Sequence, residues 1–247
     1  MSSMTPHEKA AQRSRHLLPL VTIALIGCLG GCQNEPDDAP LPSARVPATE
    51  AGTVPPLPDS GDIDAGTYFV TSLTEPFEIT VPDGWTSDGD GLGKDDPGHP
   101  GEGAVYLIFW PTDHVPTDAC AWRDALVEVD PSAQAFVDAM AAQTSTASTP
   151  PVEVRVGDYS GFEFDHSVED AVDITACDDD KICPRSESSN YCTRWYSSVA
   201  ERETYKVVDV NGKLAVMGVT YFHESINPEL TREARAVFDS IAFKSDK

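Results

Sequence analysis

The sequence predicts an α+β domain that follows a leader and a flexible linker. Three observations lead to this prediction. Short segments have the alternating pattern of β-strands, an Asn211-Gly212 dipeptide separates two apolar runs as in a β-hairpin, and two segments repeat apolar residues at helical spacing. These signals fall within about 180 residues, which is enough chain for one core, so we expect one globular domain over residues 65–247.

The N-terminus predicts a lipoprotein signal peptide over residues 1–31. Basic residues precede an uncharged run over 17–31, which is shorter than the roughly 20 apolar residues that a membrane span needs. The run ends in Leu29-Gly30-Gly31-Cys32, which resembles the lipobox of bacterial lipoproteins. We therefore expect cleavage before Cys32 and lipid on its thiol, which would hold the protein at the extracytoplasmic face of the cell membrane. The alternatives are a plain signal peptide or an uncleaved anchor.

A linker and a strong negative charge follow the leader. Residues 32–64 are rich in Pro, Ala and Asp without apolar periodicity, which predicts a disordered tether. The chain has a formal charge of −24, and removal of residues 1–31 takes away three basic side chains and one acidic side chain, which leaves −26. Such a domain repels nucleic acid and anionic headgroups, so we expect membrane contact through the lipid alone and no nucleic-acid partner.

The first half of the domain predicts several strands. Residues 67–70 and 77–81 have strand patterns, and 82–84 form a turn signal before Trp85. The apolar run over 103–110 predicts a central strand.

Two hairpins are predicted after the middle of the chain. Residues 151–156 and 161–165 flank a Gly-Asp-Tyr turn, and 205–210 and 214–222 flank Asn211-Gly212, the dipeptide typical of type I′ turns.

Two helices are also predicted. The first covers about 132–143, with Asp130 or Ser132 as N-cap, and the second runs from Pro228 at N1, behind the N-cap Asn227, to about Ser240. Their apolar stripes are Phe136, Val137 and Met140 in the first helix, and Leu230, Ala234, Val237 and Ile241 in the second.

The order of these elements resembles that of a known fold. Phe77-Glu78-Ile79-Thr80-Val81-Pro82-Asp83-Gly84-Trp85, the middle helix, the late Val-Asp-Val-Asn-Gly hairpin and the terminal Phe238-Asp239-Ser240-Ile241-Ala242-Phe243 are similar to the PsbP-like fold, which includes photosystem accessory proteins and mycobacterial LpqN-type lipoproteins. More narrowly, Gly91-Leu92-Gly93-Lys94 and Asp118-Ala119-Cys120-Ala121-Trp122 resemble a group of actinobacterial lipoproteins. The resemblance implies a single antiparallel β-sheet with two main helices packed against it, as an α/β/α sandwich, and an accessory or binding role without catalytic residues.

Four cysteines remain in the domain, namely Cys120, Cys177, Cys183 and Cys192. Outside the cytoplasm an even number predicts two disulfides, and three pairings are open. We favour Cys120–Cys177 and Cys183–Cys192, with a polar, exposed loop over 178–191. The rival interpretation is a zinc site, which the missing Cys-x-x-Cys spacing disfavours.

An acidic segment is a weak calcium candidate. Alternate carboxylates from Asp88, Asp90, Asp95 and Asp96 suit one hard cation, but Leu92 and His99 stand where further ligands would be needed. We prefer an acidic turn before a short strand and expect no metal. The same glycines lack the context of a phosphate loop, and we expect no cofactor.

Catalytic motifs are missing from the sequence. Asp113-His114 and Asp165-His166 place acid beside base, but sequence neighbours on a strand point to opposite faces. No nucleophile elbow or zinc-protease motif occurs, so we interpret His114, His166 and His223 as surface or strand-end residues.

The aromatic residues allow two interpretations, a sheet core or the lining of a binding surface. They are Trp85, Trp110, Trp122, Trp195, Tyr196, Tyr205, Tyr221 and Phe222. The sequence thus favours a non-enzymatic, membrane-anchored module that binds an envelope protein or a small ligand. The alternatives are an envelope hydrolase without a known motif and a calcium-stabilised structural protein.

Overall fold

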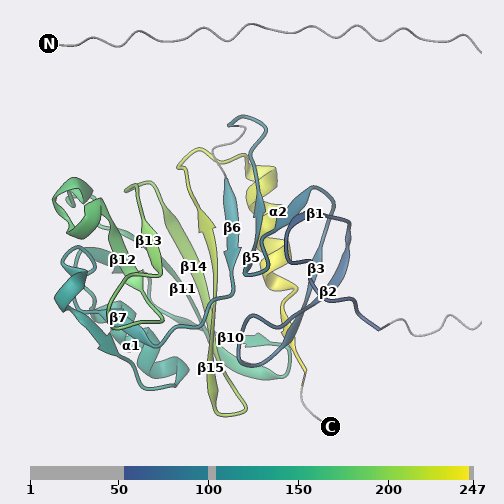
Figure 1. Cartoon of the computed structure of the whole chain (residues 1–247), viewed down its shortest axis with the longest axis horizontal. Helices are drawn as coiled ribbons and strands as arrows, with labels where there is room; N and C mark the ends of the chain where they lie inside the picture. Colours follow the sequence, from purple (N-terminus) through teal and green to yellow (C-terminus); the bar gives the residue numbers. More distant parts are fainter. Residues whose placement is uncertain (1–52, 100–103, 245–247) are drawn as a thin grey trace, which may run out of the picture. The chain divides into compact units, whose positions relative to one another are not determined.

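A computed structural model describes residues 53–99 and 104–244 (Figure 1). These residues form sixteen β-strands in four sheets and two α-helices, so the protein is mostly β. The predicted single sheet with two main helices packed against it is therefore wrong. The predicted signal peptide and Cys32 lie outside the described residues.

The largest sheet has nine strands, and all of its neighbours pair antiparallel. Its order is β1 (Gly61–Ile63), β4 (Trp85–Ser87), β5 (Gly91–Lys94), β6 (Val105–Ile108), β15 (Lys213–Tyr221), β14 (Arg202–Val210), β11 (Tyr159–Val168) and β10 (Val152–Val156), with β9 (Thr146–Ser148) also on β11. The predicted hairpin at Asn211-Gly212 is confirmed: it joins β14 to β15, and both residues have the positive φ that a type I′ turn requires. The run predicted as a central strand supplies β6, within this sheet.

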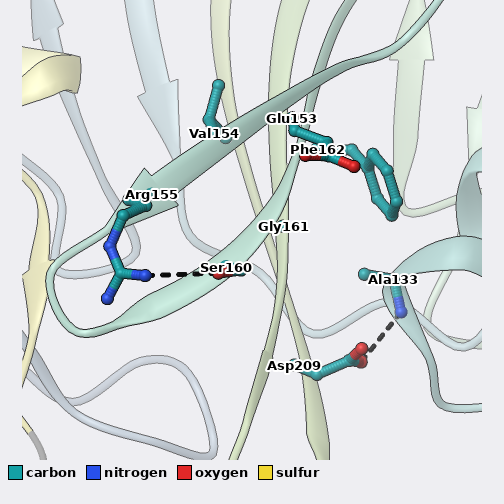
Figure 2. Close-up of a pocket in the computed structure, with 8 residues that line it drawn as sticks. All are labelled: Ala133, Glu153, Val154, Arg155, Ser160, Gly161, Phe162 and Asp209. Carbon is teal, nitrogen blue, oxygen red and sulfur yellow. Dashed lines mark hydrogen bonds between the residues drawn. The ribbon is translucent and has the colours of Figure 1, made fainter.

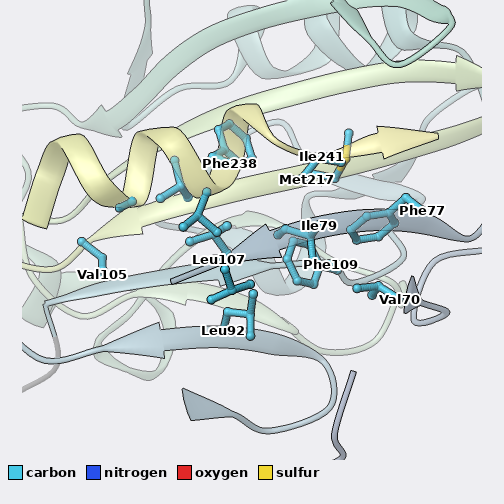
Figure 3. Close-up of a cluster of buried hydrophobic side chains, with 14 of the residues drawn as sticks. Val70, Phe77, Ile79, Leu92, Val105, Leu107, Phe109, Met217, Phe238 and Ile241 are labelled. Atoms are coloured by element: carbon cyan, nitrogen blue, oxygen red, sulfur yellow. The ribbon is translucent and has the colours of Figure 1, made fainter. Parts of the chain in front are cut away.

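One face of this sheet packs against α2 (Pro228–Asp239) and a three-stranded sheet. That small sheet has the order β16 (Ala242–Phe243), β3 (Phe77–Val81) and β2 (Gly66–Val70). Figure 3 shows Phe238 of α2 and Ile79 of β3 close to Leu107 of β6. The start of α2 agrees with the sequence, because Asn227 accepts a hydrogen bond from the Glu229 amide at 2.9 Å and Pro228 occupies the first turn.

The opposite face packs against α1 (Ala133–Ala142) and two small hairpins. The hairpins are β7 (His114–Pro116) with β8 (Leu126–Glu128), and β12 (Ile182–Arg185) with β13 (Arg194–Tyr196). Strand alternation explains the two faces: Val208 and Met217 belong to the core beneath α2, whereas Val207 and Val216 belong to the core beneath α1. Ser132 caps α1 by accepting from the Ala135 amide at 3.2 Å.

Short strands explain why the fold class was predicted incorrectly. The strands β1, β4, β7, β8, β9, β13 and β16 have three residues or fewer. A two-residue period cannot be recognised in so short a segment, and only pairing with distant strands defines them. Short 3-10 turns at Trp122–Asp124, Ile174–Ala176 and Asp178–Asp180 complete the described elements.

The domain also begins earlier than expected. The tether was predicted to reach residue 64, yet Leu57 donates to the Phe69 carbonyl at 2.8 Å, and the Phe69 amide donates back to the Pro55 carbonyl at 2.8 Å. With β1 paired to β4, residues 55–63 join the folded unit. No helix in the described part of the chain is long and apolar enough to cross a membrane.

The four cysteines form the two favoured pairs, Cys120–Cys177 and Cys183–Cys192. The expectation of an exposed polar loop over 178–191 is wrong for its middle, because every residue of β12 is buried. The Cys183 amide donates to the Ala119 carbonyl at 2.8 Å, which fixes the second disulfide against the chain next to the first.

Candidate ligand-binding cavity

A buried network of charged residues lies between β13, β14 and β15. The Arg194 Nε donates to Glu203 Oε2 at 3.0 Å, and the Tyr205 hydroxyl donates to the same oxygen at 2.9 Å. Arg185, fully buried on β12, places its Nη2 3.7 Å from Glu203 Oε1. Burial would raise the pKa of Glu203, but the Arg194 and Arg185 guanidiniums hold it below its ordinary value. The Glu203 carboxylate is therefore charged and shared by two cations.

The charges of the buried network balance each other. Arg194 also lies 3.7 Å from Glu201, whose Oε1 accepts from the Ser197 amide at 2.8 Å. Two guanidiniums thus face two carboxylates, Glu201 and Glu203. The sequence did not reveal this network, because Arg185 lies within the stretch 178–191, whose polar composition predicted an exposed loop.

An aromatic cavity of about 290 Å³ adjoins this network on the same face of the sheet. Tyr106 and Ile108 project from β6, and Tyr106 is in register with Thr220, to which Arg194 donates at 3.0 Å. The same alternation that buries Leu107 beneath α2 therefore turns its neighbours toward β13. The aromatic cavity is lined by Asp88, Tyr106, Ile108, Trp110, Thr193, Arg194, Trp195, Ser197, Glu201 and Phe222.

The aromatic cavity combines apolar rings with a few polar groups. The Trp110 Nε1 is buried and donates to no acceptor among the described residues. The Tyr106 hydroxyl donates to the Asp88 carboxylate, and burial, together with this hydrogen bond, raises the pKa of Tyr106. Mostly apolar walls with a small number of placed donors and acceptors are typical of small-molecule sites.

A second, outer cavity of about 460 Å³ shares three residues with the first, namely Trp110, Thr193 and Trp195. It adds Asp90, Glu187 and Tyr191, and both Tyr191 and Trp195 are large aromatic side chains left exposed. Trp195 thus borders both cavities and is partly open to solvent.

A cavity of about 490 Å³ at the other edge of the sheet is a weaker candidate (Figure 2). Its polar groups already have structural partners, since Asp209 accepts from the Ala133 amide at 2.8 Å at the start of α1. Arg155 donates to the Asp158 carbonyl at 2.7 Å and to Ser160 within its own hairpin. It contains no aromatic residue except Phe162.

The four calcium candidates do not share one site. Asp96 is buried and accepts from the Gly98 and Asn227 amides, both at 2.9 Å, which lowers its pKa and fixes the start of α2. Asp88, Asp90 and Asp95 are exposed. In the ranges 53–99 and 104–244, no group of three or more His, Cys, Asp or Glu side chains is arranged to hold a metal ion.

The acid and base neighbours in the sequence behave differently from each other. His114 Nδ1 lies 2.5 Å from Asp113 Oδ1, so this pair does meet, contrary to the expectation. Asp165 instead accepts from Thr204 at 2.6 Å, and His166 points the other way, with Nδ1 2.9 Å from Ser148 Oγ. The interpretation of His166 as a surface residue is wrong, because it is only 1% exposed.

The sequence named part of the aromatic cavity. Trp110, Trp195 and Phe222 line this cavity, and of the two interpretations of the aromatic residues, sheet core or cavity lining, the second applies to them. The other named aromatic residues, Trp85, Trp122, Tyr196, Tyr205 and Tyr221, are buried. Tyr106 and the polar lining other than Asp88 were missed, and Tyr106 reaches the neighbourhood of β13 only through the pairing of β6 with β15.

The sequence was also compared with known proteins. No protein-family model matches the chain. No curated protein matches it significantly.

Proposed function

We propose that this protein is a lipid-anchored extracytoplasmic module that binds a small ligand in the aromatic cavity and does not transform it. The observation that carries the proposal is a cavity of about 290 Å³ lined by the rings of Tyr106, Trp110, Trp195 and Phe222 beside the buried Arg194–Glu203 pair. The four rings would supply apolar contact area for a small ligand.

Rigidity supports a binding role. The cavity wall formed by β13 is fastened to the sheet through Arg194, which contacts both Glu203 and Thr220 at 3.0 Å. The Cys183–Cys192 disulfide closes the loop directly before this wall. A preformed site loses little conformational entropy on binding.

The hydrolase alternative gains little from the contact between Ser148 and His166. Ser148 Oγ lies 3.3 Å from the Met140 carbonyl, to which it donates, and therefore accepts from His166 Nδ1–H. In that arrangement the histidine is not a base for the hydroxyl proton. His166 lines neither the aromatic cavity nor the outer cavity.

Binding is tested by saturation-transfer NMR with a mixture of small sugars, amino acids, organic amines and aromatic acids. We expect at least one class to bind the wild-type domain and to lose the signal in Trp195→Ala. The matched control is Phe69→Ala, which removes another partly exposed aromatic ring from β2. Ligands that bind all three proteins equally, or none that binds the wild type, would contradict the proposal.

The anchor is tested separately. We expect Cys32→Ser in the full chain to abolish labelling by an alkyne fatty acid and to release the protein from membranes. A variant that remains membrane-bound, or a wild type that takes up no label, would remove the anchor from the proposal without affecting the cavity.

A further inference from the structure

We propose that the ligand of the aromatic cavity is a small organic cation, of the ammonium class, held by aromatic faces and by uncompensated carboxylates. This inference rests on the proposed function, because it names the chemistry of a ligand for that same site. It follows from the balance of charge around the cavity and from the rings that line it.

The buried network contributes no net charge. Arg194 and Arg185 are matched by Glu201 and Glu203 at 3.0 to 3.7 Å. The guanidinium of Arg194, which lines the cavity, is therefore already balanced by carboxylates of the protein and is not free to hold an anionic ligand.

The carboxylates at the openings have no such partners. Asp88 lines the aromatic cavity, and Asp90 and Glu187 line the outer cavity. Within residues 53–99 and 104–244, no lysine, arginine or histidine forms an ion pair with any of the three. Even with the Lys181 ammonium beside Trp195 counted, the three carboxylates leave the combined opening negative, in a protein of formal charge −24, so it attracts cations.

The rings provide the second half of a cation site. Tyr106, Trp110 and Trp195 line the aromatic cavity, and the faces of such rings attract ammonium groups through their quadrupole. Trp195 already does so within the protein, because the Lys181 ammonium lies 4.5 Å from its ring centre. A neutral sugar would use the same rings, but it would leave the uncompensated carboxylates unmatched.

Choline is a suitable probe, because 3,3-dimethyl-1-butanol has the same shape without the charge. We expect choline to bind the wild-type domain and the neutral analogue to bind at least about tenfold more weakly, as measured by calorimetry and by tryptophan fluorescence. We expect Trp195→Ala to weaken choline binding about tenfold and Asp88→Asn about threefold. The control Glu153→Gln, which removes one exposed carboxylate at the opposite edge of the large sheet, should leave choline binding unchanged.

Two outcomes overturn this inference. Equal binding of choline and its neutral analogue would show that shape, and not charge, is recognised. Failure of choline and of tetramethylammonium to bind in the millimolar range would exclude the cation. In either case a sugar or acid that binds the wild type but not Trp195→Ala would leave the proposed function standing, whereas the absence of any Trp195-dependent ligand would remove both.

Discussion

Gly218 leaves the space that the carboxylate of Glu203 occupies. A Cβ atom at Gly218 would lie 2.0 Å from Glu203 Oε1, which is far inside van der Waals contact. Gly218 is in register with Tyr205 on β14, and Glu203 lies two residues before Tyr205 on the same face of that strand. The bare backbone at this position therefore makes room for a charged group inside the protein.

Gly218→Ala should destabilise the domain by about 1–3 kcal/mol, because the methyl group must displace a carboxylate that two arginines hold in place. Gly66→Ala is the matched control, since its Cβ would meet only side-chain atoms of Tyr68 at 3.6 Å and beyond. Urea unfolding followed by circular dichroism measures both. Equal free energies of unfolding for the two variants would show that the Glu203 carboxylate moves aside without a loss of stability.

Glu203→Gln should cost about 3–5 kcal/mol of unfolding free energy, because it leaves two buried guanidiniums with one carboxylate fewer. The control is Glu229→Gln, whose partner Arg232 lies 3.9 Å away in an exposed pair, and this change should cost less than about 1 kcal/mol. Thermal and urea unfolding of both variants at neutral pH provide the comparison. A loss below 1 kcal/mol for Glu203→Gln would contradict the role given to the buried charge.

His166 should make stability fall as the pH is lowered. Burial lowers its pKa to about 4 in the folded protein, against 6.5 in the unfolded chain. Between these values the unfolded chain binds the proton and the folded protein does not. The stabilisation is therefore complete above pH 6.5 and is lost as the pH falls toward 4, by up to about 3 kcal/mol.

The measurement is urea unfolding across this pH range for the wild type and for His166→Gln. Carboxylates such as Glu203 also titrate at the acid end, so the difference between the two proteins isolates the histidine. If the free energy of unfolding depends on pH in the same way in both proteins, His166 takes up its proton equally in the folded and the unfolded state, and the prediction is wrong.

Local sequence signals predicted the elements whose stability is local. The type I′ hairpin at Asn211-Gly212 and the caps Ser132 and Asn227 depend on residues within one turn, and all three are present. The sheets could not be predicted in the same way. β1 pairs with β4, and β16 pairs with β3 across more than half of the described chain, so their partners are set by tertiary packing alone.

The charged network was hidden for a related reason. A charged residue in a polar stretch is normally solvent-exposed, and the segment around Arg185 had that composition. Its burial depends on Glu203 and on the space at Gly218, which are distant in sequence. The aromatic residues of the cavity can be identified in the sequence by their type alone. Which of them face solvent depends on the pairing of distant strands, and local sequence patterns do not show that pairing.

The two disulfides should rank differently for stability and for binding. Cys120–Cys177 closes a separation of 57 residues and Cys183–Cys192 closes one of 9. In the chain-entropy account the longer loop stabilises by about 4 kcal/mol and the shorter by about 2.5 kcal/mol. Replacing each pair by serines should therefore lower the melting temperature more for Cys120→Ser/Cys177→Ser.

Ligand binding should follow the opposite order. Cys192 lines the outer cavity and precedes Thr193, which lines both cavities, whereas neither Cys120 nor Cys177 lines either one. We expect Cys183→Ser/Cys192→Ser to weaken binding of any Trp195-dependent ligand several-fold, because residues before β13 lose their restraint, and the other pair to leave affinity nearly unchanged at temperatures where it is folded. Calorimetry on both double variants measures the affinity and the melting temperature. If the variant with the lower melting temperature also has the weaker affinity, the Cys183–Cys192 disulfide does not act on the cavity.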